Sequence, residues 1–166
     1  LWQAPFSLHQ NVVAAIRAEA AAARSGKRAR IIAKMNSLLE PAVIVALYEA
    51  SQAGVKIDLI VRGVCALRPG IKGKSENIRV RSIVGRLLEH HRVFYFYAGG
   101  EEKVYLASAD WMERNFFRRI ELAFPILDTK LKRRVISEGL RVYLTDNVQA
   151  WDMDANGHYH PRRSFR

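Results

Sequence analysis

Two stretches of the sequence contain residue types that bind phosphate. Arg62-Gly63 follows the apolar run from Lys56 to Val61, and an arginine at the end of a strand can donate two parallel hydrogen bonds to phosphate oxygens. The loop from Arg68 to Ser75 carries glycines, which let a backbone approach an anion, together with Lys72 and Lys74. Its spacing is not that of a Walker loop. Taken alone, a surface arginine at a strand end is the commoner case, and the basic loop is a weak signal that a mobile loop explains equally well.

A histidine pair, His90-His91, lies next to Arg92 at the expected start of a strand. Side chains alternate along a strand, so His90 and Arg92 should point to one side and His91 to the other. A histidine at this position can act as an acid, a base or a phosphate contact. Ser108 and Asp110, at the end of the expected partner strand, could orient the histidine or a bound phosphate. Taken alone, a histidine pair at a polar strand end more often has no role.

The elements that position these residues begin with a strand-helix-strand unit. Residues 29–35 and 56–61 are short, apolar and bounded by polar residues, which predicts two buried strands. Between them, Pro41 suits the first turn of a helix that ends near Gly54. Such a unit implies a parallel pair with a right-handed crossover, and ligands of open α/β sheets bind at the carboxyl ends of the strands. Arg62 is therefore expected at the ligand-binding edge.

Other local signals complete a single α/β domain. Ser7 and Gln10 form a capping-box pattern ahead of an alanine-rich helix that runs to about Arg24. The remaining predicted elements are a short helix at 82–88, strands at 93–97 and 104–107 joined by a hairpin at Gly99-Gly100, a strand at 119–124, a helix at 128–143 and a hairpin around Asn156-Gly157.

The composition limits the class to which the protein can belong and the kinds of partner that it can bind. The chain has 166 residues, 49% of them hydrophobic, which fits one soluble domain with its own core. No apolar run is long enough for a membrane span, and we expect the N-terminus to be a cut inside a longer chain. One cysteine, Cys65, agrees with a reducing compartment. The net charge of +11 favours a polyanion, which could be nucleic acid, an anionic membrane or a phosphate-rich molecule, unless it only keeps the surface soluble.

The histidine and serine segments together resemble the second motif of the phospholipase D-like superfamily. That motif is H-x-K followed by a Gly-Ser-x-Asn turn, and here it reads His90-x-Arg92 and then Ala107-Ser108-Ala109-Asp110. Longer strings, among them RIIAKMNSL, YEASQAGVKIDLIVRG, SENIRVRSIVGRLLEH and VYLASADWMERN, are similar to polyphosphate kinase, the family that makes polyphosphate from ATP. The resemblance implies an α/β, phospholipase D-like domain at 7–166, with a mixed, largely parallel sheet flanked by helices. Residues 1–6 would be a lead-in from a preceding domain.

The resemblance to that family implies that this chain carries half of a phosphoryl-transfer site. Arg62 and His90 would contact ATP or its phosphates, with His90 as the catalytic residue of this half. Lys72, Lys74 and Arg92 would line a path for polyphosphate. The phosphohistidine nucleophile and the Mg²⁺ ligands would belong to the preceding domain, so we expect no metal ligand in this chain. The intact enzyme would use ATP and ADP, bind no specific nucleic acid, form a homo-oligomer and work in the cytoplasm, either free or associated with a membrane.

Two other classes of function are compatible with the residues. A basic α/β module could bind nucleic acid without catalysis, with Phe94, Tyr95, Tyr97 and Trp111 stacking on bases. Alternating aromatic residues on two paired strands are more often part of a core. The chain could also serve assembly of the enzyme, which is compatible with the first interpretation.

Overall fold

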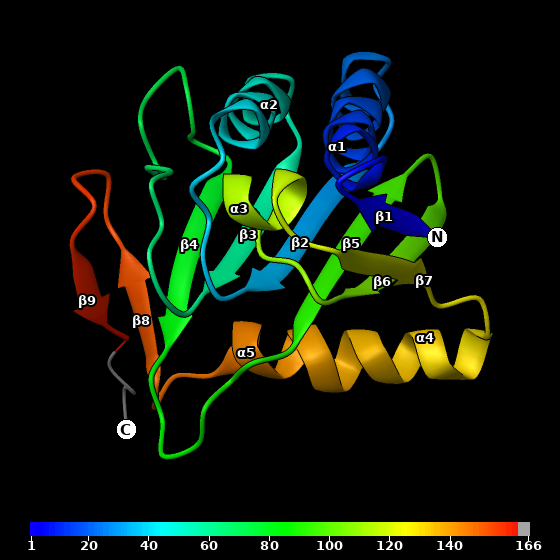
Figure 1. The fold of residues 1–166 in the computed structure, drawn as a ribbon. Coiled ribbons are helices and arrows are strands. Elements are labelled where there is room, and N and C mark those ends of the chain that lie inside the picture. Colours follow the sequence, from blue (N-terminus) through cyan, green and yellow to red (C-terminus); the bar gives the residue numbers. More distant parts are fainter. Residues whose placement is uncertain (163–166) are drawn as a thin grey trace.

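The computed structural model describes residues 1–162, whose strands form one sheet between two layers of helices (Figure 1). In chain order the strands are β1 (Trp2–Ala4), β2 (Ala29–Met35), β3 (Lys56–Val61), β4 (Ile78–Ile83), β5 (Arg92–Ala98), β6 (Glu101–Ala107), β7 (Glu121–Pro125), β8 (Ala150–Met153) and β9 (Tyr159–Pro161). They lie in the sheet in the order β1-β7-β6-β5-β2-β3-β4-β8-β9.

Helices cover both faces of this sheet. On one face lie α1 (Leu8–Arg24) and α2 (Pro41–Gln52), and on the other lies a continuous helical segment made of α4 (Thr129–Ile136), a π-helical stretch η1 (Ser137–Arg141) and α5 (Val142–Thr145) (Figure 1). The short α3 (Glu113–Phe117) follows the end of β6. The predicted α/β class, with a mixed sheet flanked by helices, is confirmed.

The parallel part of the sheet is smaller than predicted. Only the pairs β2–β3 and β3–β4 are parallel among the described strands, and the pairs on either side of this group are antiparallel. The predicted strand-helix-strand unit forms the pair β2–β3. The hairpin of β5 and β6 then adds to the free edge of β2, where an antiparallel partner needs no crossover helix.

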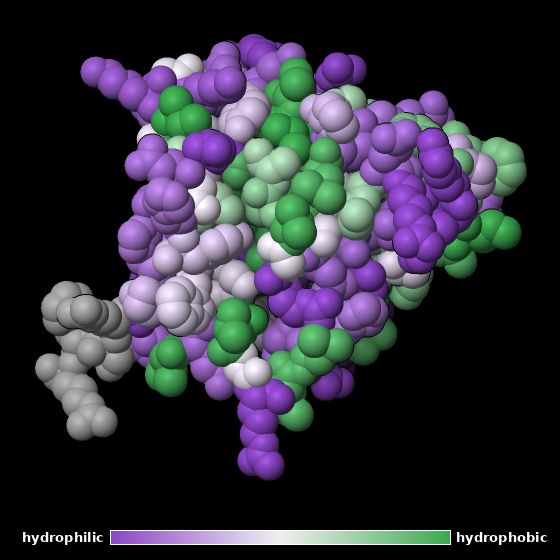
Figure 2. Space-filling model, turned by 60° about the vertical axis from the view of Figure 1, so that its left-hand side comes forward, coloured by the Kyte–Doolittle hydropathy of each residue, from purple (hydrophilic) through white to green (hydrophobic). Residues whose placement is uncertain are grey.

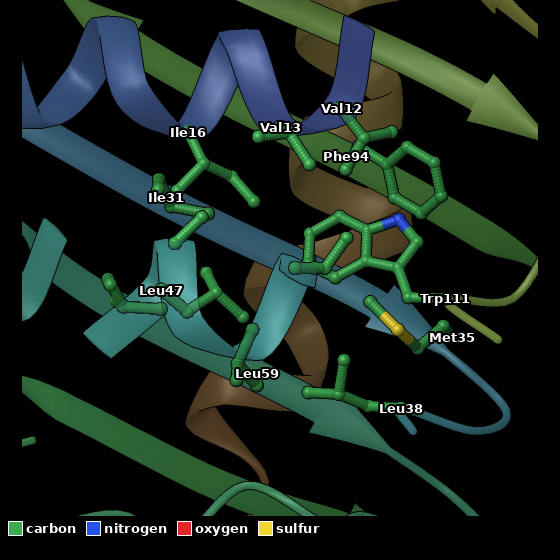
Figure 3. Close-up of a cluster of buried hydrophobic side chains, with 14 of the residues drawn as sticks. Val12, Val13, Ile16, Ile31, Met35, Leu38, Leu47, Leu59, Phe94 and Trp111 are labelled. Carbon is green, nitrogen blue, oxygen red and sulfur yellow. The ribbon is translucent and has the colours of Figure 1, made fainter. Parts of the chain in front are cut away.

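The main core lies between the sheet and the layer of α1 and α2. Val12 and Ile16 of α1 pack over Ile31 of β2, and Trp111 and Phe94 fill the space toward the end of the strands (Figure 3). The rings of Trp111 and Phe94 are 5.0 Å apart between centroids. A smaller second core, which includes Ile32, Tyr95 and Leu140, lies under η1 on the opposite face.

Three local predictions differ from the structure. The helix predicted at 82–88 is wrong, since β4 covers Ile78–Ile83 and the chain continues as a loop to β5. Ser7 precedes α1 as predicted, yet its side chain does not cap the helix; its Oγ accepts from the backbone N–H of Gln3 at 3.0 Å. The expected lead-in, 1–6, contains a strand that was not predicted, since Trp2–Ala4 form β1 at the edge of the sheet. The last residues of the expected domain, 163–166, lie outside the described residues.

Candidate functional site at the strand ends

The candidate site lies where β2, β3 and β6 end and β5 begins. Because β5 runs antiparallel to β2 and β6 antiparallel to β5, these four chain positions share one edge of the sheet. Arg62 follows β3, His90 precedes β5 and Asp110 follows β6. The residues that meet at this edge, here called the strand-end cluster, are Lys34, Asn36, Arg62, His90, Arg92 and Asp110.

Asp110 holds this edge together. Its carboxylate accepts hydrogen bonds from Arg92 Nε at 3.1 Å, from Arg92 Nη2 at 3.2 Å and from the backbone N–H of Asn36 at 2.7 Å. The backbone N–H of Asp110 in turn donates to Asn115 Oδ1 at 3.1 Å. Two parallel bonds are the strongest arrangement for an arginine and a carboxylate. The guanidinium of Arg92 is therefore engaged by Asp110, and Arg92 acts here as a positioning residue.

His90 is fixed through its backbone and leaves its side chain available. Its carbonyl accepts from Asn36 Nδ2 at 3.5 Å and from Arg92 Nη1 at 3.3 Å, and the residue as a whole is exposed. The two donors are Asn36, which follows β2, and Arg92, which is the first residue of β5. The imidazole of His90 thus lies at the strand ends, on a backbone that these two hydrogen bonds hold in place.

His91 has different surroundings, on the side of the helical segment. Its Nε2 lies 3.2 Å from the Gly139 carbonyl of η1, and its ring centroid is 5.4 Å from that of Tyr143. Burial lowers the pKa of His91, and the nearby charge of Lys34 lowers it further. The His91 ring therefore lies against η1 and Tyr143 of the helical segment.

Arg62 carries a buried hydrogen-bond donor without an acceptor. Within residues 1–162, its Nη1 and the nearby Asn36 Oδ1 are buried and have no hydrogen-bond partner. A buried polar group without a partner costs about 1–3 kcal/mol, more if it is charged, so this atom at a strand end is a candidate contact for a ligand. Gly63 permits this arrangement, because a Cβ at that position would lie 2.7 Å from the Asn36 carbonyl oxygen.

Lys34 is a member of the cluster that the sequence patterns did not single out. Its side chain is only 2% exposed, its Nζ donates to the His91 carbonyl at 3.3 Å, and it lies 5.0 Å from the centroid of the Tyr143 ring. Burial lowers the pKa of Lys34 to about 8; the charges of Arg62 and Arg92 add to the lowering, and Glu89 opposes it. The signal in the sequence was a lysine inside an otherwise apolar strand.

Two predicted groups lie elsewhere. Ser108 faces β7, where its Oγ donates to the Glu121 carboxylate and accepts from the backbone N–H of Leu122. Lys74 lies over the Tyr48 ring of α2, 4.8 Å from its centroid, in a loop that ends beside the amino-terminal end of β3. The structure therefore does not bring Lys72 and Lys74 to the strand-end cluster.

Three of the four aromatic residues of the nucleic-acid alternative are buried inside the protein. Phe94 and Trp111 are both 0% exposed, and Tyr95 is also buried (Figure 3). Stacking on a base requires an accessible ring face. These three side chains form core contacts instead, whereas Tyr97 is half-buried and lines a cleft on the other face of the sheet.

The strand-end cluster does not suit a metal ion. Within the described part of the chain, no group of three or more His, Cys, Asp or Glu side chains is placed to hold one. Its charged groups are mostly cations, and the carboxylate of Asp110 is engaged by Arg92. Among the same residues, no helix is both long and apolar enough to cross a membrane.

The fold is that of the phospholipase D-like proteins. The phospholipase D family member Nuc from Salmonella typhimurium superimposes with a TM-score of 0.62 over 92% of this chain and 95% of its own, at 17% identity. NucT from Helicobacter pylori does so with a TM-score of 0.54, at 15% identity over 82% of this chain and 91% of its own. At such identities the likeness concerns the fold alone.

The sequence pattern of the family described as polyphosphate kinase C-terminal domain 2 matches residues 1–166, and the chain belongs to this family. It is 71% identical over 98% of its length to a polyphosphate kinase of Paraburkholderia phytofirmans, of which it covers 24%. The crystal structure of a polyphosphate kinase from Porphyromonas gingivalis superimposes with a TM-score of 0.92, at 42% identity over 98% of this chain and 25% of that one. This chain thus spans about a quarter of the length of these relatives.

Nucleotide binding by the intact enzyme is expected to take up protons near pH 8. In the free protein about half of Lys34 is neutral at that pH, and a phosphate beside Arg62 would favour the ammonium form. Isothermal titration calorimetry at pH 8, in two buffers of different ionisation enthalpy, should show an uptake of up to about half a proton. Lys34→Met should abolish the uptake, whereas Lys27→Met, at an exposed lysine, should preserve it. Equal uptake in all three proteins would place the titrating group elsewhere.

Proposed function

We propose that this chain supplies the phosphate-binding half of a polyphosphate kinase active site. In the proposed reaction, the γ-phosphate of ATP passes to inorganic polyphosphate through a phosphohistidine in a preceding domain, and the reaction is reversible. Arg62 binds phosphate oxygens of the nucleotide. His90, the catalytic residue of this half, contacts the transferring phosphate or protonates the departing oxygen.

The unpartnered Nη1 of Arg62 is the observation that supports this proposal most directly. Phosphoryl transfer depends on positioning and on neutralising the charge of the phosphate oxygens. Arg62 offers a free donor, and Lys34 adds positive charge beside it. Asp110 is the one carboxylate of the cluster, and its charge is already engaged by Arg92.

The position of His90 supports a site shared with another domain. The loop before it, 84–88, exposes large apolar side chains: Val84 is 62%, Leu87 77% and Leu88 74% exposed. Apolar patches among hydrophilic residues are seen on the side of the molecule turned forward in Figure 2. Exposed apolar groups next to a catalytic candidate favour contact with another part of the protein. In this proposal the preceding domain covers loop 84–88 and carries the phosphohistidine and the Mg²⁺ ligands.

Other parts of the proposal rest on the family. Polyphosphate would enter along Arg92, whose guanidinium is partly engaged, and Lys72 and Lys74 would contact the polymer further away, since their loop lies outside the strand-end cluster. The intact enzyme is proposed to form a homo-oligomer in the cytoplasm. Cys65 is the one cysteine of the sequence and cannot form an internal disulfide, which agrees with a reducing compartment.

The isolated 166-residue chain is expected to bind ATP and tripolyphosphate without making polyphosphate. Its core supports folding, but the proposed nucleophile lies in another domain. Circular dichroism would establish that the chain is folded, and polyphosphate would be measured after incubation with ATP and Mg²⁺, with the intact enzyme as the positive control. Robust synthesis by the isolated chain would show that the nucleophile is inside it.

A comparison of anions separates this proposal from generic polyanion binding. Tripolyphosphate and double-stranded DNA would be titrated against the chain at increasing salt. Specific phosphate binding should depend on Arg62, whereas binding of DNA should be lost steeply with salt and be indifferent to this residue.

A further inference from the structure

A second basic site lies on the face of the sheet that carries α4. A cleft of about 870 Å³ opens between this face and the segment from α4 to α5. Volumes of this size are typical of small-molecule sites. Its walls come from the beginning of β2, the end of β5, and the helical segment, with Arg28, Arg30, Tyr97, Arg133 and Arg141 among the lining residues.

The cleft borders the place where the helical segment packs on the sheet, through the buried Leu140 and through Val135, Ile136, Tyr143 and Leu144, which are partly buried against the same core. Leu140 of η1 is the one buried side chain among the residues of α4, η1 and α5, all of which the structure describes. It packs with Ile32 and Tyr95 in the second core. α4 buries none of its side chains, and it extends across the sheet beyond this contact (Figure 1). The space left between α4 and the sheet is the cleft.

Most of the charge that lines this cleft is uncompensated. Arg30 is paired with Asp58 at 2.7 Å. By contrast, no ion pair among residues 1–162 involves Arg28, Arg133 or Arg141. Glu102 is the one acidic residue of the lining. The neighbouring Arg134 shows the contrast, since it pairs with Glu138 of its own helical segment at 3.0 Å. The cleft thus presents an excess of positive charge, which favours an anion.

The rest of the lining indicates what kind of anion fits. Ile32, Ile136 and Leu144 provide apolar surface. The guanidinium of Arg28 lies 5.7 Å from the centroid of the Tyr97 ring, so a planar cationic group and an aromatic ring stand together at the wall. An inorganic phosphate chain has no apolar group to place against this surface. A nucleoside polyphosphate has a planar base that can contact the wall and phosphates that can bind the arginines.

We propose that this cleft is a second nucleotide site, which binds a nucleoside polyphosphate with its phosphates on Arg133 and Arg141. It is separate from the strand-end cluster. None of the residues that line the cleft belongs to the strand-end cluster, and Arg28 and Arg30, at the start of β2, lie roughly 20 Å along that strand from Arg62 beside its end. The assignment does not depend on the catalytic role proposed for the strand-end cluster.

The test counts nucleotides bound by the intact enzyme. Equilibrium dialysis with a non-hydrolysable ATP analogue is expected to give about two nucleotides per chain. In the double variant R133Q/R141Q, affinity at the second site should fall at least about tenfold, because charged hydrogen bonds to phosphate are lost. R134Q is the matched control and should keep both sites. The arginines are exposed, and the nucleotide that the double variant retains at the strand ends would show that it is folded.

Photolabelling with 8-azido-ATP locates the second nucleotide. The label is expected in the peptides that contain 95–102 or 129–145, and ATP should compete for it better than tripolyphosphate does. Nucleotide binding that R133Q/R141Q leaves unchanged, or a label confined to other peptides, would overturn the proposal. A single wild-type nucleotide that R133Q/R141Q loses would instead overturn nucleotide binding at the strand ends. Equal competition by tripolyphosphate would show that the cleft recognises charge alone, which would also overturn the proposal.

Discussion

Replacing His90 by alanine in the intact enzyme is expected to lower kcat by about 100- to 10,000-fold, the usual cost of losing a positioned acid–base group. The fold should be little affected. The carbonyl of His90, which the substitution leaves in place, accepts the hydrogen bonds from Asn36 and Arg92. The exposed imidazole contributes little to the core. Steady-state kinetics and thermal unfolding of the same preparation would measure the two effects separately.

His91→Ala is the matched control for this experiment. His91 contacts Gly139 and Tyr143 of the helical segment, so its loss should lower the melting temperature more than the His90 substitution does. Its effect on kcat should be much milder, because the His91 ring lies against the helical segment. Equal losses of activity in the two variants would mean that the wrong histidine has been assigned to the site.

Arg62→Lys should weaken ATP binding by ~1.5–3 kcal/mol, the value of one hydrogen bond to a charged group. Lysine keeps the charge but cannot reproduce the planar, two-pronged geometry of a guanidinium. Nucleotide titration of the intact enzyme at a fixed salt concentration would measure the effect. Arg79→Lys is a suitable control, because the Arg79 side chain is 73% exposed and lies 3.4 Å from Asp58. Indistinguishable dissociation constants for wild type and Arg62→Lys would remove Arg62 from the site.

The parts of the fold that were predictable from sequence are those with uniform local patterns. The apolar runs at 29–35 and 56–61 are buried strands, and Pro41 begins α2 as expected. β4 was missed because its buried residues include Arg81. The guanidinium of Arg81 is satisfied by the carbonyls of Tyr143 and Leu144, at 2.9 and 2.6 Å, and these acceptors are far away in the sequence.

The candidate site was predictable to a similar extent. The ends of the predicted strands and the resemblance to the motif placed Arg62 and His90 at the same end of the sheet. The structure brings the segments that contain them together. Lys34 and Asn36 could not be assigned in this way, because their roles depend on partners from distant segments. Lys34 needs Tyr143 and the His91 carbonyl, and Asn36 needs Asp110. The pairing of Arg92 with Asp110 is likewise a tertiary contact. The spacing of residues in the sequence does not show whether Arg92 is paired or free.

The bonds of Asp110 bear on how the site behaves during a reaction cycle. One carboxylate fixes the end of β2 through Asn36 and the beginning of β5 through Arg92. In the proposed function, the dipoles and charges around the substrate would then be oriented when the chain folds, before any nucleotide arrives. As phosphoryl charge shifted during the proposed transfer, this edge would have little structure left to rearrange, and its reorganisation energy would be small. The entropy of ordering these groups is lost once, at folding, and is not lost again in each turnover.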